Sequence, residues 1–255
     1  MLVNLVPEFL SVLSAADATA AYHEYLDRHR PVLSAYWHNY VLDPESPHAE
    51  PIIAAALRAD RSDLKRLLED VDVVAIAEDA LRRATELLEA DCPVDLYLMV
   101  GVGAANAGEL VVGGRGIAFA CLEHFTGRAN AQTYGMGLAP HLLPLWIAHE
   151  VAHTLRYTSP SSRAALRRLV AELGGYFDCW EAGSRATLRE LVVNGGRPSR
   201  RLRRSRQGSS RGNTSATIAG STGGCGSWMR SCAALRRMTS TPPGWVSGSA
   251  TSRAA

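Results

Sequence analysis

Two histidines and a glutamate lie within five residues of one another: His149, Glu150 and His153 form the pattern HExxH. On a helix, a spacing of four residues places both imidazoles on one face, where they can bind the same ion. Zinc (Zn2+) takes three protein ligands at a catalytic site and keeps a fourth position for water, whose pKa it lowers. Glu150 would act as the general base that takes the proton of that water. The pattern therefore predicts a zinc-dependent hydrolase, with His149 and His153 as ligands.

The residues around this pattern predict a shielded helix. Pro140 opens the stretch HLLPLWIAHEVAHTLRY, in which the positions beside the pattern are uncharged. A strand-rich segment precedes the helix, as expected for a sheet edge that binds substrate. The alternative is a buried helix with two structural histidines, but two histidines and a glutamate are costly to bury without a purpose.

A third ligand is needed, and Glu172 is the tentative candidate. It follows His153 after 18 intervening residues, on a helix predicted over 161–173. The spacing fits a metal ligand and fits equally an exposed helical glutamate, and the sequence leaves both interpretations open.

The elements that position the motif predict an α+β fold, mostly helical with a small mixed or antiparallel sheet. Residues 8–90 show helical periodicity interrupted by prolines, and Asp63 is the expected cap of one of these helices. The apolar N-terminus has no basic residue before its apolar run, which predicts the start of a helix and not a signal peptide. Short apolar runs separated by glycines predict two or three strands over 94–125. After a loop at 126–139 and the motif helix, we expect a last helix at 184–193.

Charge divides the chain in two. Residues 1–190 hold all 25 acidic residues and carry a net charge of −9, whereas residues 191–255 hold no acid and 11 arginines. We predict one domain over 1–194, helical over 1–90 and with the sheet and motif helix over 91–194. The remainder, 195–255, is rich in Arg, Gly and Ser, and we expect a disordered tail.

Cysteine content and hydropathy favour a cytoplasmic protein. The five cysteines are odd in number and form no CxxC pair, which argues against a disulfide framework. No apolar run approaches the roughly 18 residues of a membrane span. We expect a peptide or protein substrate, no membrane partner and no specific nucleic acid.

The helical N-terminal half, the small sheet, the HEVAH helix and the stretch LRELVVN at 188–194 together resemble a bacterial family of predicted zinc-dependent proteases, which is gluzincin-like. The resemblance covers roughly residues 10–194 and implies a zincin-like active-site helix and peptide hydrolysis. In such families the third ligand lies in an Asn-Glu-Gly motif, but here Asn194 is followed by Gly195 and Gly196. This break coincides with the change in composition, so we hypothesise that the last 60 or so residues are a frameshift product.

Two alternative functions remain open. One is a catalytically impaired protein of zincin fold, since a third ligand would be lost with the shifted frame. The other is non-specific nucleic-acid binding through the Arg-rich stretch at 197–211, which lacks interleaved aromatic residues. The remaining histidines, including His124 and His141 beside the loop, are expected to be structural or exposed.

Overall fold

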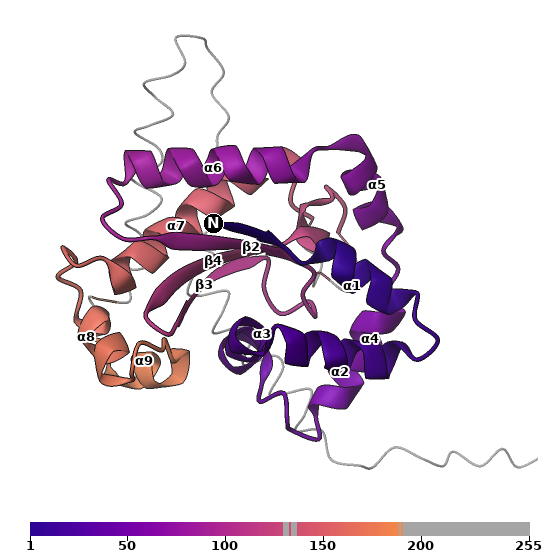
Figure 1. Cartoon of the computed structure of the whole chain (residues 1–255), viewed down its shortest axis with the longest axis horizontal. Helices are drawn as coiled ribbons and strands as arrows, with labels where there is room; N and C mark the ends of the chain where they lie inside the picture. Colours follow the sequence, from indigo (N-terminus) through magenta and orange to yellow (C-terminus); the bar gives the residue numbers. More distant parts are fainter. Residues whose placement is uncertain (130–132, 134–136, 189, 191–255) are drawn as a thin grey trace, which may run out of the picture.

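The computed structural model describes residues 1–129, 133, 137–188 and 190. Within this part of the chain, a four-stranded sheet has the order β1-β2-β4-β3 and carries helices on both faces (Figure 1). The first three strands of that order run parallel, and β3 is antiparallel to β4. The predicted α+β class with a small mixed sheet is confirmed. The strands are β1 (Leu2–Asn4), β2 (Val94–Met99), β3 (Ala107–Val112) and β4 (Arg115–Cys121).

The first strand corrects one expectation. The N-terminal residues were expected to begin a helix, but Leu2–Asn4 form β1, and helix α1 begins only at Val6. The Leu96 amide donates to the Met1 carbonyl at 2.8 Å, and the Leu5 amide donates to the Leu98 carbonyl at the same distance. Leu2, Val3 and Asn4 are too few to show an alternation, so the sequence does not distinguish this strand from the first turn of a helix.

The helical N-terminal half is confirmed, and prolines lie at its breaks. Asp63 lies in the first turn of its helix and not at the cap, which is Arg61. Aspartate caps occur elsewhere: Asp17 accepts the Ala20 amide and Asp72 accepts the Ala75 amide, both at 2.9 Å. The elements are α1 (Val6–Leu13), α2 (Ala18–Arg28), α3 (Arg30–Tyr36), the π-helix η1 (Trp37–Val41), α4 (Ala49–Arg58), α5 (Ser62–Asp70) and α6 (Val73–Leu87).

The motif helix is α7 (Leu143–Thr158), which packs on β3 and β4 with α6 beside it. The 3-10 turns η2 (Leu122–Phe125) and η4 (Pro140–Leu142) precede it. Figure 1 shows α6 and α7 on one face of the sheet and α2 and α3 on the other. The apolar side chains of Ile147 and Val151 are fully buried against the sheet, as the uncharged flanks of the motif predict.

Two short helices follow, α8 (Ala165–Glu172) and α9 (Cys179–Arg185). The helix expected over 184–193 is not continuous, because α9 ends at Arg185 and the chain is helical again at Leu188 and Glu190. The predictions for 195–255 lie outside the described residues. In the described part no helix is long and apolar enough to cross a lipid bilayer. Its three cysteines, Cys92, Cys121 and Cys179, are free thiols.

Candidate metal centre

One turn of α7 brings the predicted ligand pair together. The Nε2 atoms of His149 and His153 lie 2.9 Å apart, and their ring centroids lie 4.6 Å apart. A carboxylate oxygen of Glu150 lies within 4.8 Å of both rings. His153 and Glu150 are buried, whereas His149 is half-buried and packs beside Trp146. Among the described residues, these three form the one group of His, Cys, Asp or Glu that could hold a metal ion.

The spacing of the two nitrogens fits a zinc ion. Two ring nitrogens at about 2.05 Å from a tetrahedral ion lie about 3.3 Å apart. The observed separation is 2.9 Å, so an opening of about 0.4 Å, within reach of a small χ rotation, would complete that geometry. Imidazoles and a carboxylate are donors that zinc accepts, and His149 and His153 are the residues that would hold it.

Burial keeps the His149 imidazole in the form that binds metal. It lowers the pKa of His149 to about 3, with a smaller contribution from repulsion by His153. A neutral imidazole offers a ring nitrogen to a cation without first losing a proton. Burial also raises the pKa of Glu150 well above its usual range, and the neighbouring Glu109 carboxyl raises it further. The two histidines therefore lie in a region where the binding of a divalent cation would be favourable.

Glu109 of β3 is a site residue that the sequence did not indicate. Its carboxyl is hydrogen-bonded to that of Glu150. The Tyr157 hydroxyl donates to Glu109 Oε1 at 3.2 Å, and the Tyr40 hydroxyl lies 3.2 Å from Oε2. No described Lys or Arg side chain forms an ion pair with either glutamate, so two carboxyls meet without a protein cation between them. Nothing in the sequence near Glu109 marks it, because strand pairing and helix packing bring it to α7.

The edge of β3 bears on the expectation of a sheet edge that binds substrate. That expectation named no strand, and at Glu109 and Val111 the described chain already occupies the edge groups of β3. The Tyr40 hydroxyl accepts the Glu109 amide at 3.0 Å and lies 3.1 Å from the Glu109 carbonyl. Two residues along, the Val111 carbonyl accepts the amide of Phe177 at 3.0 Å. An added strand would have to displace these partners, since each edge group bonds one strand at a time.

Gly108 makes room for the tyrosine that covers this edge. A Cβ at Gly108 would lie 2.4 Å from the Tyr40 hydroxyl oxygen and 2.6 Å from Phe119 Cζ. Both distances are shorter than real carbon contacts, so only glycine lets the Tyr40 ring lie against the strand. The Tyr40 ring also packs edge-on against Phe119 with centroids 5.0 Å apart.

The structure does not bring Glu172 to the pair. It lies at the end of α8 with its side chain more than half exposed, and it accepts a hydrogen bond from Arg185 at 2.7 Å. It is absent from the group formed by His149, Glu150 and His153. An exposed ion pair of this kind is the alternative that the spacing alone left open.

Most of the other histidines behave as expected. His23, His29 and His38 each pair with a carboxylate, at 3.0, 2.7 and 2.9 Å. His141 is exposed. His124 differs from the expectation of a loop residue: it is fully buried in η2, neither ring nitrogen has a hydrogen-bond partner among the described residues, and burial lowers its pKa to about 4.

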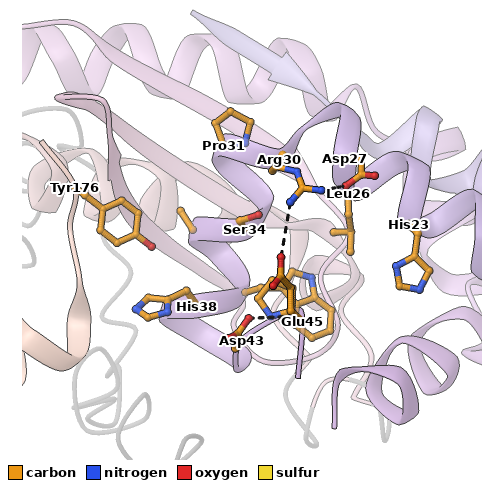
Figure 2. Close-up of a pocket in the computed structure, with 13 residues that line it drawn as sticks. His23, Leu26, Asp27, Arg30, Pro31, Ser34, His38, Asp43, Glu45 and Tyr176 are labelled. Atoms are coloured by element: carbon orange, nitrogen blue, oxygen red, sulfur yellow. Dashed lines mark hydrogen bonds and ion pairs between the residues drawn. The ribbon is translucent and has the colours of Figure 1, made fainter. Parts of the chain in front are cut away.

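A pocket of about 640 Å³ lies beside the π-helix and away from the histidine pair. Figure 2 shows Arg30 reaching toward Asp27 and Glu45 on one side, with His38 and Tyr176 on the other. None of the three residues of the metal group lines it. Its charged side chains largely neutralise one another in exposed ion pairs, which is typical of a solvated surface.

Comparisons with family models, with curated proteins and with solved structures found no match. What is established for this site is a histidine, glutamate and histidine group on a helix, in an HExxH-like arrangement that could hold a metal ion.

Proposed function

We propose that this chain is a zinc-dependent hydrolase that cleaves peptide bonds. The observation that supports the proposal most directly is the pair of Nε2 atoms 2.9 Å apart on a buried helical turn, with a carboxyl between the two histidines in sequence. When bound, zinc would polarise the substrate carbonyl and make water acidic enough to attack at neutral pH. The resemblance to predicted bacterial zinc-dependent proteases agrees with this chemistry, and a cytoplasmic location is part of the proposal.

Each residue of the group has a distinct role in the reaction. His149 and His153 bind through neutral ring nitrogens, because burial keeps His149 unprotonated down to a pH of about 3. Glu150 takes a proton from the attacking water and returns it to the leaving amine nitrogen. The buried flank of α7 keeps bulk water from the two imidazoles and from the Glu150 carboxyl, which strengthens their electrostatic interactions.

One observation favours a second candidate, a catalytically impaired protein of the same fold. Within the described residues, no third side chain joins the two histidines except Glu150 itself. If Glu150 coordinates the metal, it cannot also accept the proton, so the protein would bind zinc without turnover. The two candidates make different predictions for one substitution, Glu150→Gln.

The deciding experiment compares the wild-type chain with Glu150→Gln. We would measure zinc per chain by mass spectrometry and cleavage of a mixture of quenched fluorogenic peptides. The proposed function predicts about one zinc in both proteins and turnover in the wild type alone, reduced by at least about 100-fold in the variant. Glu86→Gln on the exposed face of α6 is the matched control and should change neither quantity.

His153→Ala completes the design, because it should lose both the zinc and the activity. Zinc bound by the wild type without any turnover would favour the impaired protein. Equal cleavage by wild type and Glu150→Gln would refute the proposed role of Glu150.

A further inference from the structure

We propose that Glu109 is a positioning residue that holds the Glu150 carboxyl in the orientation needed for proton transfer. The inference rests on the proposed function, in which Glu150 is the general base. It assigns a role to a strand residue 41 positions before Glu150, and to the two tyrosines that hold it.

The Glu150 side chain would be mobile without a neighbour that holds it. A glutamate side chain rotates about three bonds, so a base on a helix samples many positions unless a neighbour holds it. A displacement of about 1 Å can cost about 100-fold in rate, because proton transfer requires hydrogen-bond distance. The only charged neighbour that contacts the Glu150 carboxyl among the described residues is the carboxyl of Glu109.

Glu109 is itself held in place by its neighbours. Its backbone is part of the sheet, where Glu109 pairs with Ala118 of β4. Each of its carboxyl oxygens has a tyrosine hydroxyl at 3.2 Å, from Tyr157 of α7 and from Tyr40 of η1. Tyr157 is fully buried and Tyr40 nearly so. Glu109 is therefore fixed by its backbone pairing and by both tyrosine hydroxyls, independently of its contact with Glu150.

The contact between Glu109 and Glu150 adds little to stability. Two carboxyls in contact, with no Lys or Arg of the described residues paired to either, do not stabilise a fold, because ionisation of both leaves like charges together. A hydrophobic or amide side chain would pack the same space at lower cost. Arrangements that cost stability are common where function depends on them. Glu109 contacts the Glu150 carboxyl, one oxygen of which lies within 4.8 Å of the ligand nitrogens of the histidines.

The test uses Glu109→Ala, Glu109→Gln and Tyr157→Phe in the full chain. We would measure zinc content, kcat and KM on the peptide mixture, and the ¹³C carboxyl resonance of Glu150 in protein labelled at glutamate. The Glu150 resonance is assigned by its loss in Glu150→Gln. Tyr97→Phe on β2 and Glu86→Ala on α6 are controls, because neither side chain contacts this group.

Positioning predicts that Glu109→Ala keeps its zinc and its KM but loses about 10- to 100-fold in kcat, as expected for a misplaced base. It also predicts a shifted Glu150 resonance. Glu109→Gln should recover kcat to within about fivefold, because its amide still donates to Glu150 and still accepts from a tyrosine. Tyr157→Phe should lose several-fold in kcat. An unmoved resonance, or a kcat within twofold of wild type in Glu109→Ala, would overturn the proposal.

The spectroscopic measurement separates this inference from the proposed function. If the wild type binds zinc but cleaves nothing, the proposed function fails. In that event the resonance alone decides: a shift in Glu109→Ala that is reversed in Glu109→Gln supports positioning of Glu150, and no shift refutes it.

Discussion

His38 Nε2 and Asp178 Oδ2 lie 2.9 Å apart, although 140 residues separate them in the sequence. The other oxygen of Asp178 accepts the amides of Trp180 and Glu181, at 2.8 and 3.0 Å, and so caps helix α9. One carboxylate thus joins the π-helix η1 to the start of α9. The same two segments are joined again by Asn39, whose side chain donates to the Phe177 carbonyl at 3.1 Å and accepts the Cys179 amide at 2.8 Å. These contacts hold the chain that covers the β3 edge.

Replacing Asp178 by alanine should therefore destabilise the protein by about 1–2 kcal/mol, the usual cost of losing an aspartate cap. Urea denaturation at pH 7 measures the change, and limited proteolysis should show faster cleavage near α9. Glu181→Ala, which removes only an exposed partner of Arg185, should stay within about 0.5 kcal/mol of wild type. Equal stability of Asp178→Ala and the control would mean that the cap does not hold α9.

Glu123 should make stability fall as pH rises toward neutrality. Burial raises its pKa to about 7 from an ordinary value of 4.5, although Arg61 acts in the opposite direction. The folded state then binds a proton that the unfolded state releases between these values, so this stabilisation is complete below pH 4.5 and is lost as pH rises through 7. Between pH 4.5 and pH 8, the free energy of unfolding of the wild type should fall by up to about 3 kcal/mol relative to that of Glu123→Gln. Chemical denaturation across this pH range measures it, and parallel curves would contradict the expected pKa.

Gly108→Ala should cost about 1–3 kcal/mol, because the new methyl group overlaps Tyr40 and Phe119. The double variant with Tyr40→Phe tests the part played by the hydroxyl, since its removal relieves the closest of the three contacts and leaves Tyr40 Cζ and Phe119 Cζ, both at 2.6 Å. The cost of Gly108→Ala should be smaller in the Tyr40→Phe background. Identical costs in both backgrounds would show that the Tyr40 hydroxyl does not press on this glycine.

Zinc should stabilise the folded chain by an amount that grows with the logarithm of its free concentration above the dissociation constant. At a free concentration 100 times the dissociation constant, a ligand that binds only the folded state adds about 2.7 kcal/mol. Thermal unfolding with and without a chelator should show this gain in the wild type and not in His149→Ala or His153→Ala. Glu150→Gln should keep most of the gain. A chelator that leaves the wild-type transition unchanged would argue against a bound metal.

The metal group could be predicted from sequence because it is local. His149 and His153 share a face through helical spacing alone, and the apolar residues beside them predict the burial of α7. Glu109 and Tyr40 could not be found in this way, because their approach depends on which strand lies at the sheet edge and which helix covers it. The β1 strand was missed since three residues, Leu2 to Asn4, are too few to show a period. Glu172 shows the limit of spacing, because 18 intervening residues fix no position in space once a loop separates two helices.

The π-helix has a consequence for how this protein tolerates change in length. A π turn contains one residue more than an α turn and is costlier, so η1 behaves as a single-residue insertion at the end of the helical segment that begins at Arg30. Deleting one residue from 37–41 would restore regular winding and turn all that follows by about 100° relative to what precedes it. Such a deletion would improve the local geometry of the helix and yet swing Tyr40 away from β3. The length of this one turn, more than its composition, therefore keeps the sheet edge closed.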